Sequence, residues 1–214
     1  ITGERGFIAK NLKLFLKERS DIKIFTFSKK NKISDLTKLV DKVDFIFHLA
    51  GVNRPENLIE FTLGNETLTQ ELCGVIKKTN RKIPVLYTSS TQADLDNPYG
   101  VSKNNTENIL FNFSKDCKIP VYIFRLPNVF GKWCKPNYNS VVATFCYNII
   151  RDIPININNS KDLIDLVYID DVIDHFIRVM DNSKKKIEIK DHQLVNPLYQ
   201  ITVGELSKQL FAFK

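Results

Sequence analysis

Short apolar segments alternate with longer segments of helical periodicity from the start of this chain to about residue 130. The strand-like segments lie at 22–27, 44–51, 84–90 and 121–125, and helical patterns lie between them. Continuous apolar runs are typical of parallel strands that are buried on both faces, and an intervening helix returns the chain to the same edge of the sheet. The alternation therefore predicts an α/β fold with a doubly wound parallel sheet, which binds ligands outside the carboxyl ends of its strands.

The regular alternation ends near Gly131. Beyond it the sequence indicates a helix at 141–151, a strand at 163–168, and a helix from 170 to 180 that Asp170 is expected to cap. These elements are shorter and less regular than those before them, as in a small lobe added to the sheet.

Two parts are therefore expected. Residues 1–130 form a Rossmann-type domain, and residues 131–214 form a smaller lobe that binds and covers a substrate. The chain opens on Ile1, Thr2 and Gly3, which resemble the end of a strand, so we expect the first strand to be truncated. The C-terminal lobe is expected to be truncated as well.

Charge and composition exclude several classes of protein. The formal net charge is +7, but the lysines are scattered, with short clusters only at 29–30 and 184–186, so nucleic acid is not an expected partner. Charged or polar residues interrupt the apolar runs well before about 18 residues, which predicts no membrane span and a cytoplasmic protein. The four cysteines form no C-x-x-C pair, so we expect neither a metal site nor a disulfide framework.

A glycine-rich turn precedes the first helical pattern. Gly3, Arg5 and Gly6 stand just before an amphipathic run, where free backbone N–H groups and the helix dipole favour a pyrophosphate. The next strand-like segment ends in Ser28 and Lys29 and lacks the acidic residue that binds a ribose 2′-hydroxyl. This pattern favours NADP(H) over NAD, unless the lysines simply form a solvated turn.

Tyr99 and Lys103 are four residues apart at a predicted helix start. Residues with this spacing share one face of a helix. An ammonium beside a phenol lowers the pKa of the phenol and makes it a usable proton donor, which suits carbonyl reduction. The spacing also occurs by chance in many helices, so its meaning depends on the surrounding motifs.

Several motifs follow one another along the chain, and their order is more specific than any one of them. The glycine-rich turn is followed by His48-Leu49-Ala50-Gly51, Thr88-Ser89-Ser90, the Tyr99/Lys103 pair, and the segment 125–131. Together they resemble the extended short-chain dehydrogenase/reductases that act on nucleotide sugars. The segments 49–55, 96–99 and 130–140 are similar to the reductase domain of CapF-type enzymes of capsular polysaccharide synthesis.

This resemblance implies an activity and a set of site residues. CapF-type members use NADPH to reduce the 4-keto group of a UDP-2-acetamido-2,6-dideoxy-hexulose, and a cupin domain follows their reductase domain. The implied catalytic residues are Tyr99 as general acid, Lys103 as its partner, and Ser90, or less favourably Ser89, as the hydroxyl that binds the carbonyl oxygen. The implied cofactor-binding residues are Gly3, Arg5, Gly6, Phe7, Ile8, Ser28, Lys29, Leu49, Ala50, Gly51, Tyr99 and Lys103. The implied substrate-binding residues are Arg54, Ser90, Asn128, Lys132, Trp133 and Tyr138.

Other roles of the same fold stay open. Thr91 and Gln92 stand where dehydratases carry an Asp-Glu pair, which argues against a 4,6-dehydratase. A 4-epimerase with tightly bound NAD uses the same Tyr/Lys pair, and a non-catalytic dinucleotide-sensing protein is a third possibility. His48 is expected to be a core histidine, and the family resemblance implies a homodimer.

Overall fold

The computed structural model describes residues 1–183 and 192–214, so the lysine cluster at 184–186 lies outside the described residues. A parallel sheet contains β1 (Ile46–His48), β2 (Val85–Ser90) and β3 (Val121–Leu126), in that spatial order. Thr2 adds single parallel bridges to Phe27 and to His48, and so extends this sheet beyond β1. The predicted α/β class is confirmed.

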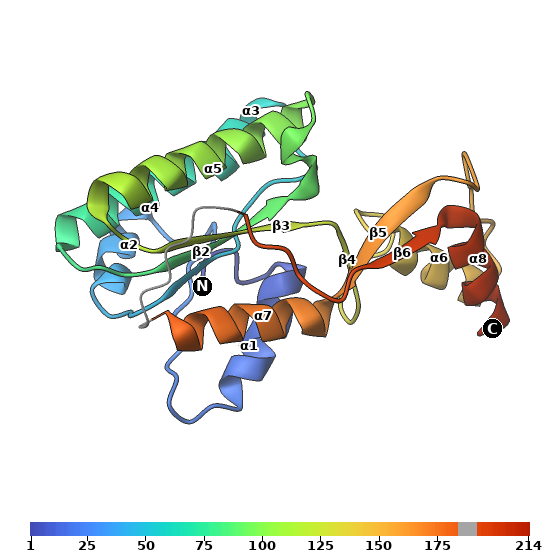
Figure 1. Cartoon of the computed structure of the whole chain (residues 1–214), viewed down its shortest axis with the longest axis horizontal. Helices are drawn as coiled ribbons and strands as arrows, with labels where there is room; N and C mark the ends of the chain where they lie inside the picture. The colour runs from blue at the N-terminus through green and yellow to red at the C-terminus, as the bar shows by residue number, and fades with distance from the viewer. Residues whose placement is uncertain (184–191) are drawn as a thin grey trace.

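Helices cover both faces of this sheet (Figure 1). One layer contains α2 (Ile33–Val40), α4 (Leu68–Thr79) and α5 (Pro98–Cys117), and the opposite layer contains α1 (Phe7–Lys17) and α7 (Ile169–Asn182). Alternate residues of each strand enter different cores, because successive side chains point to opposite faces. Tyr87 of β2 packs in the core under α4 and α5, whereas Tyr122 of β3 packs in the core under α1 and α7.

The expectation of a strand at 22–27 is wrong. Within this segment only Phe27 forms a bridge, to Thr2. A strand needs a continuous ladder, and among the described residues the bonds here are few; they include one from the Ile1 amino group to the Phe25 carbonyl and one from the Gly3 N–H to the Phe27 carbonyl.

The helical pattern expected between the segments 44–51 and 84–90 is divided in the structure. A short α3 (Ile59–Phe61) leads into a π-helical turn, η1 (Thr62–Thr67), and then into α4. Asn65 lies in this turn and is buried. Wide turns of this kind are frequent at functional sites.

The second sheet is smaller and stands beside the first (Figure 1). Its strands are β4 (Asn128–Phe130), β5 (Leu163–Tyr168) and β6 (Tyr199–Thr202), with β4 parallel and β6 antiparallel to the central β5. The sheet packs on α6 (Val141–Ile150) and α8 (Val203–Ala212) through a separate small core.

The chain returns to the first sheet through α7. Gln193 then forms a parallel bridge to Phe124 of β3. Asp170 was expected to cap α7, but the N-cap residue is Tyr168, and Asp170 lies in the first turn. In that position its carboxylate still faces the positive end of the helix dipole.

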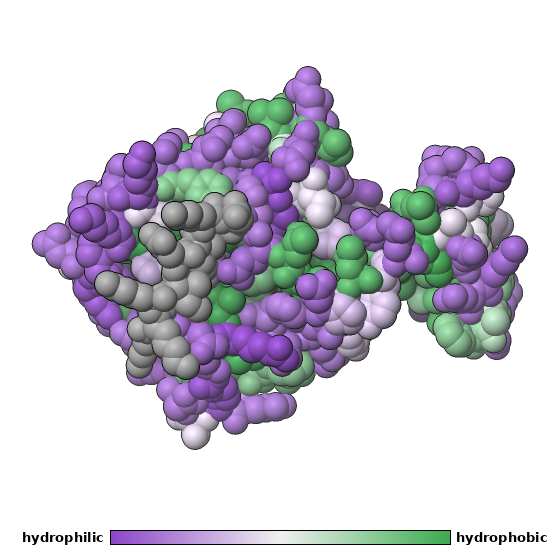
Figure 2. All heavy atoms as spheres, viewed as in Figure 1, coloured by the Kyte–Doolittle hydropathy of each residue, from purple (hydrophilic) through white to green (hydrophobic). Residues whose placement is uncertain are grey.

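The surface in Figure 2 is largely hydrophilic, with separate apolar patches on both parts of the molecule. Within residues 1–183 and 192–214, no helix combines the length and the apolar character that a membrane crossing requires.

Candidate active site

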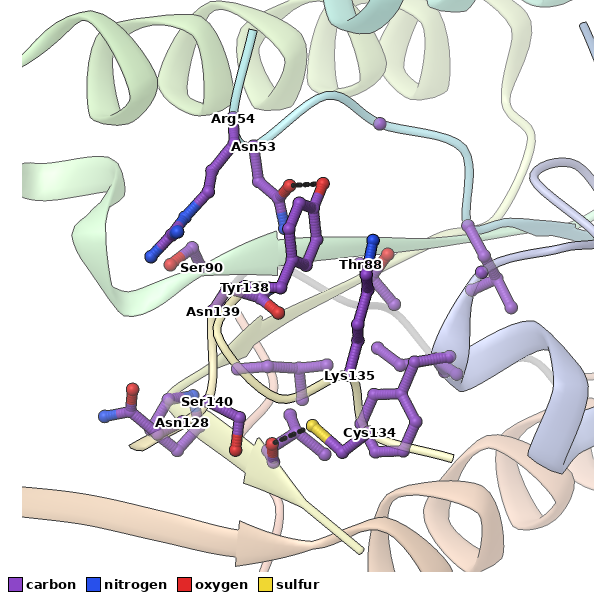
Figure 3. Close-up of a pocket in the computed structure, with 18 of the residues that line it drawn as sticks. Asn53, Arg54, Thr88, Ser90, Asn128, Cys134, Lys135, Tyr138, Asn139 and Ser140 are labelled. Carbon is purple, nitrogen blue, oxygen red and sulfur yellow. Dashed lines mark hydrogen bonds between the residues drawn. The ribbon is translucent and has the colours of Figure 1, made fainter. Parts of the chain in front are cut away.

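A large cavity opens at the carboxyl ends of β2 and β3, between the two sheets. Its volume is about 1160 Å³. Side chains from the loop after β1, the end of β2 and the loop before α6 surround it (Figure 3). The predicted site residues that line it are Arg5, Gly6, Phe7, Ile8, Leu49, Gly51, Arg54, Ser90, Tyr99, Lys103, Asn128, Trp133 and Tyr138.

A second cavity of about 790 Å³ has Arg5, Gly6, Leu49, Gly51 and Val52 in common with the first. The predicted cofactor residues that line it are Gly3, Arg5, Gly6, Ser28, Lys29, Leu49, Ala50 and Gly51. Two carboxylates, Glu60 and Glu71, also border it. The shared wall makes one extended site from the turn after residue 27 to Tyr99.

The geometry of the glycine-rich turn fits a dinucleotide. Gly3 has a positive φ of 68°, and a Cβ there would lie 2.7 Å from the Cα of Ala50, so only glycine allows this approach. Gly6 is the N-cap residue of α1, and within the described part of the chain this helix end has no side-chain cap. The backbone N–H groups of this helix end and the helix dipole are suited to hold a pyrophosphate beside both cavities.

Lys103 is buried on α5, with only 5% of its surface exposed. Its ammonium donates to the carbonyl of Thr88 at 2.9 Å and to the hydroxyl of Tyr87 at 3.1 Å. Burial lowers the pKa of Lys103 to about 8, while the negative charge of Glu107 raises it. A Cβ on Gly51 would lie 3.4 Å from this ammonium, so the glycine leaves room for it.

Tyr99 follows the first residue of α5, whose amino end is capped by the Asn97 side chain through a 2.8 Å bond from the Gly100 N–H. The Lys103 ammonium lies 5.9 Å from the centre of the Tyr99 ring, so the two residues share one helix face, as the spacing predicts.

The expectation that the pKa of Tyr99 is lowered is wrong. Burial raises the pKa of Tyr99, and a hydrogen bond with Ser90 lowers it in part. The ammonium that was expected to dominate donates instead to Tyr87 and Thr88. Tyr99 is therefore kept protonated, which suits a proton donor.

The two serines at the end of β2 face different partners. The Ser89 hydroxyl donates to the buried carboxylate of Glu107 on α5. The Ser90 hydroxyl accepts from the Gln92 N–H at 3.2 Å and bonds with Tyr99. Of the two, only Ser90 is placed to bind a group that Tyr99 also contacts.

Asn65 joins the loop after β1 to α5. Its side chain accepts from the Val52 N–H at 2.8 Å and donates to the Val52 carbonyl and to the Ser102 hydroxyl. The asparagine is fully engaged in shaping the wall of the cavity, which is a structural role.

A loop from the second lobe meets the loop after β1 across the large cavity (Figure 3). The Tyr138 hydroxyl donates to the Asn53 side chain at 2.6 Å. Arg54 and Lys135 lie 5.6 and 5.3 Å from the centre of the Tyr138 ring. Two cations and an aromatic ring therefore stand together at the cavity, a suitable arrangement for a diphosphate with an attached ring.

Lys132 and Asn128, which were also predicted to bind substrate, contact other parts of the chain. The Lys132 ammonium lies between the rings of Phe15 and Trp133, 5.9 and 5.8 Å from their centres, and it is not among the lining residues of either cavity. The Lys132 carbonyl accepts from the buried Asn11 side chain at 3.0 Å, which ties this loop to α1. Asn128 lines the cavity and donates to the Asp165 carbonyl at 3.2 Å.

His48 is the core histidine that its position predicts. It is 1% exposed, and its two ring nitrogens bond to the hydroxyls of Thr2 at 2.8 Å and Thr69 at 2.9 Å. The pKa of His48 is lowered to about 3, chiefly by burial and to a smaller extent by the charges of Lys103 and the chain's amino group.

This histidine should make stability depend on pH. Because the folded pKa is depressed, the unfolded chain takes up a proton below about pH 6.5 that the folded chain does not, and stability falls. We expect His48 to account for a loss of about 2 kcal/mol between pH 7 and pH 5. Urea unfolding should show a smaller pH slope in His48→Gln, and the His48 ring resonance should stay constant over this range. A His48 resonance that titrates near pH 6.5 would contradict the prediction.

Sequence reasoning missed several residues at the site. Tyr87, Asn53, Glu107 and Arg125 all contact predicted residues or their neighbours. The charged residue Arg125 within the apolar segment 121–126 was the available signal, because such groups are seldom buried without partners. Among the described residues, no three His, Cys, Asp or Glu side chains are grouped to hold a metal ion.

Comparison with known proteins identifies the family. Residues 1–191 match the NAD dependent epimerase/dehydratase family. The whole chain is 54% identical to the UDP-2-acetamido-2,6-beta-L-arabino-hexul-4-ose reductase of Pseudomonas aeruginosa, and covers 57% of that protein.

Solved structures agree with this assignment. The capsular polysaccharide assembling protein CapF of Staphylococcus aureus matches all of this chain with a TM-score of 0.86 and 38% identity, over 56% of its own chain. The UDP-glucuronic acid 4-epimerase of Bacillus cereus, solved with NAD, matches 99% of this chain and 82% of its own with a TM-score of 0.85. Its 21% identity supports the fold alone.

The chain thus spans little more than half the length of the reductase and of CapF. The predicted resemblance to the CapF type is confirmed at the level of sequence and fold. The chain belongs to the NAD dependent epimerase/dehydratase family.

Proposed function

We propose that this chain is an NADPH-dependent reductase of the 4-keto group of a UDP-2-acetamido-2,6-dideoxy-hexulose, in the synthesis of a capsular or surface polysaccharide. The observation that carries the proposal is the grouping of Ser90, Tyr99 and Lys103 on one cavity wall. The 54% identity to a UDP-hexul-4-ose reductase supports the choice of substrate. A cytoplasmic location remains a prediction from the pattern of apolar runs, and a homodimer remains a prediction from the resemblance.

The three residues have distinct roles in this proposal. Bound NADPH would supply the hydride for C4 of the sugar. Tyr99 donates its proton to the C4 oxygen as that oxygen gains charge, and Ser90 holds the same oxygen by a hydrogen bond. Lys103 presents its positive charge beside Tyr99 and carries a remaining N–H for a ribose hydroxyl.

The substrate would lie between the two sheets. Arg54 and Lys135 are suited to the diphosphate of the nucleotide, and Tyr138 and Trp133 to the faces of a sugar or uracil ring. Asn128 is at the edge where the sugar would meet the cofactor. Because the ammonium of Lys132 packs between two aromatic rings, we give this residue the role of a loop anchor.

The experiment is an assay of NADPH oxidation with a panel of UDP-4-keto-6-deoxy amino sugars, with the product identified by mass spectrometry. We expect oxidation with the 2-acetamido-2,6-dideoxy-hexulose and a product heavier by two hydrogen atoms. A purified protein with firmly held nicotinamide that consumes no NADPH with these keto sugars, but inverts C4 of the corresponding UDP-sugars that carry a 4-hydroxyl, would instead establish a 4-epimerase. Cofactor binding with no reaction on any member of the panel would favour a dinucleotide sensor.

Preference for NADP over NAD is a separate prediction. Lys29 is exposed beside the second cavity, in a turn that the Asn31 side chain closes by accepting from the Ser28 N–H at 2.8 Å. Replacing Lys29 by Ala should weaken NADPH binding about tenfold and leave NADH binding unchanged, because only NADPH has a 2′-phosphate.

Lys32 provides the control, since it is exposed on the same segment but does not line the cavity. Lys32→Ala should bind both cofactors as the wild type does. Fluorescence titration measures the affinities of the wild type and of both variants for NADPH and NADH. Tighter binding of NADH than NADPH by the wild type would overturn the preference, and would point to Glu60 or Glu71 as partners of the ribose.

A further inference from the structure

Tyr87 lies beneath the proposed active site and has no role in the chemistry described above. It belongs to β2, two residues before Ser89, and is 1% exposed. Its ring packs in the core under α4 and α5, and its hydroxyl points to Lys103. The tyrosine therefore meets the proposed catalytic lysine from the side away from solvent.

Lys103 is held by Tyr87 in two ways. The hydroxyl of Tyr87 accepts a hydrogen bond from the ammonium at 3.1 Å, and the ammonium lies 4.8 Å from the centre of the Tyr87 ring. A second N–H donates to the Thr88 carbonyl at 2.9 Å. Since an ammonium has three N–H donors, these two bonds direct the third toward the cavity that Lys103 lines.

The direction of the Tyr87 hydroxyl follows from its other neighbour. Thr106 donates its own proton to the Ser102 carbonyl at 2.8 Å and also bonds with Tyr87. Tyr87 therefore donates to the Thr106 oxygen and keeps a lone pair for Lys103. Burial raises the pKa of Tyr87, so the phenol stays neutral and cannot take the proton of the lysine.

Other ionisable groups lie near the Lys103 ammonium, on the elements that pack around it. Glu107, one turn further along α5, raises the pKa of Lys103 by its charge. His48 of β1 stacks near Tyr87, with ring centres 5.6 Å apart, and stays neutral because burial lowers its pKa to about 3. Tyr99 is also protonated, because burial raises its pKa. Among the described residues, Tyr87 is thus the side chain that bonds directly to the ammonium.

We propose that Tyr87 is a positioning residue that keeps the Lys103 ammonium charged and directs its free N–H into the active site. The inference rests on the proposed reductase function for its consequence in catalysis, but the contact itself is independent of that function. Loss of the Tyr87 hydroxyl should disfavour the charged form of Lys103, because a buried ammonium needs acceptors.

Tyr87→Phe tests the proposal, since it keeps the ring and removes one oxygen. Tyr122→Phe is the matched control: Tyr122 is a buried tyrosine of the neighbouring β3 whose hydroxyl has no partner among the described residues. Circular dichroism and urea unfolding verify that both variants fold. The pKa of Lys103 is measured by NMR with lysine labelled at the ε carbon, and its signal is assigned by its absence in Lys103→Met.

We expect the pKa of Lys103, about 8 in the wild type, to fall by about one unit in Tyr87→Phe and to stay unchanged in Tyr122→Phe. The basic limb of the pH profile of kcat should move down by the same amount. Turnover would then fall about fivefold near pH 8 and stay unchanged near pH 6, because only the charged lysine is active.

An unchanged Lys103 pKa in folded Tyr87→Phe overturns the proposal, as does a fall of turnover that is equal at all pH values. If the wild type reduces none of the UDP-keto sugars, the proposed function fails, yet the NMR titration still decides whether Tyr87 holds the lysine.

Discussion

Tyr99→Phe should lower turnover by about a hundredfold or more and leave NADPH affinity within about twofold of the wild type. The Tyr99 phenol carries a transferable proton and bonds with Ser90. Its ring also packs near Phe61, with ring centres 5.9 Å apart, and this packing survives the loss of the hydroxyl. The expected effect is therefore on the chemical step.

Single-turnover kinetics and a separate titration of NADPH distinguish this effect from a loss of binding. Tyr199→Phe is a suitable control, because Tyr199 is 49% exposed on β6 and lines neither cavity. Full activity in Tyr99→Phe would remove Tyr99 from the mechanism. A rise of the Michaelis constant with unchanged kcat would assign it to substrate binding instead.

The second large effect concerns the stability of the site. Glu107 is 2% exposed on α5, and Arg125 of β3 donates to its carboxylate at 2.8 and 3.0 Å. Arg125 also bonds to both oxygens of Asp94 at 2.7 Å, and Ser89 and His192 bond to Glu107. One guanidinium thus links α5, β3 and the turn after β2.

Arg125→Met should destabilise the fold by about 3–5 kcal/mol, because removing one partner of a buried ion pair leaves an uncompensated charge. Urea unfolding followed by circular dichroism measures the loss. Adding Glu107→Gln to Arg125→Met should recover part of it, since no buried unpaired charge then remains at this position.

An exposed ion pair supplies the comparison. Arg178 bonds to Asp174 one turn away on α7, and its side chain is 70% exposed. Arg178→Met should cost only about 0.3–0.5 kcal/mol. If Arg125→Met costs no more than that, the network does not hold the site together.

Much of the fold could be predicted because it follows from local patterns. The expected strand at 163–168 matches β5, and the helix expected at 141–151 ends one residue earlier in α6. Apolar runs and helical periodicity are properties of neighbouring residues, so they are visible in the chain. The segment 22–27 has the same apolar pattern, but a strand also needs a continuous ladder of bonds, and the described residues form only the Phe27 bridge along this segment.

The candidate site, like the fold, could be predicted only in part. The spacing of Tyr99 and Lys103 predicts a shared helix face, and the two residues do share it. The electrostatics differ from expectation, because the lysine donates to Tyr87 and Thr88 of a strand, and burial raises the pKa of Tyr99. No spacing along the chain indicates which strand residue lies under a given turn of a helix.

The sequence by itself determined the α/β class, the family, and the order of the phosphate-binding turn, the serines and the Tyr/Lys pair, since these depend on residue type and on short-range spacing. Only the tertiary structure decided which serine contacts Tyr99, which groups hold Lys103, and how the loop with Tyr138 meets Asn53. The physical reason is that hydrogen bonds and desolvation depend on distances between residues far apart in the chain, and packing alone sets those distances.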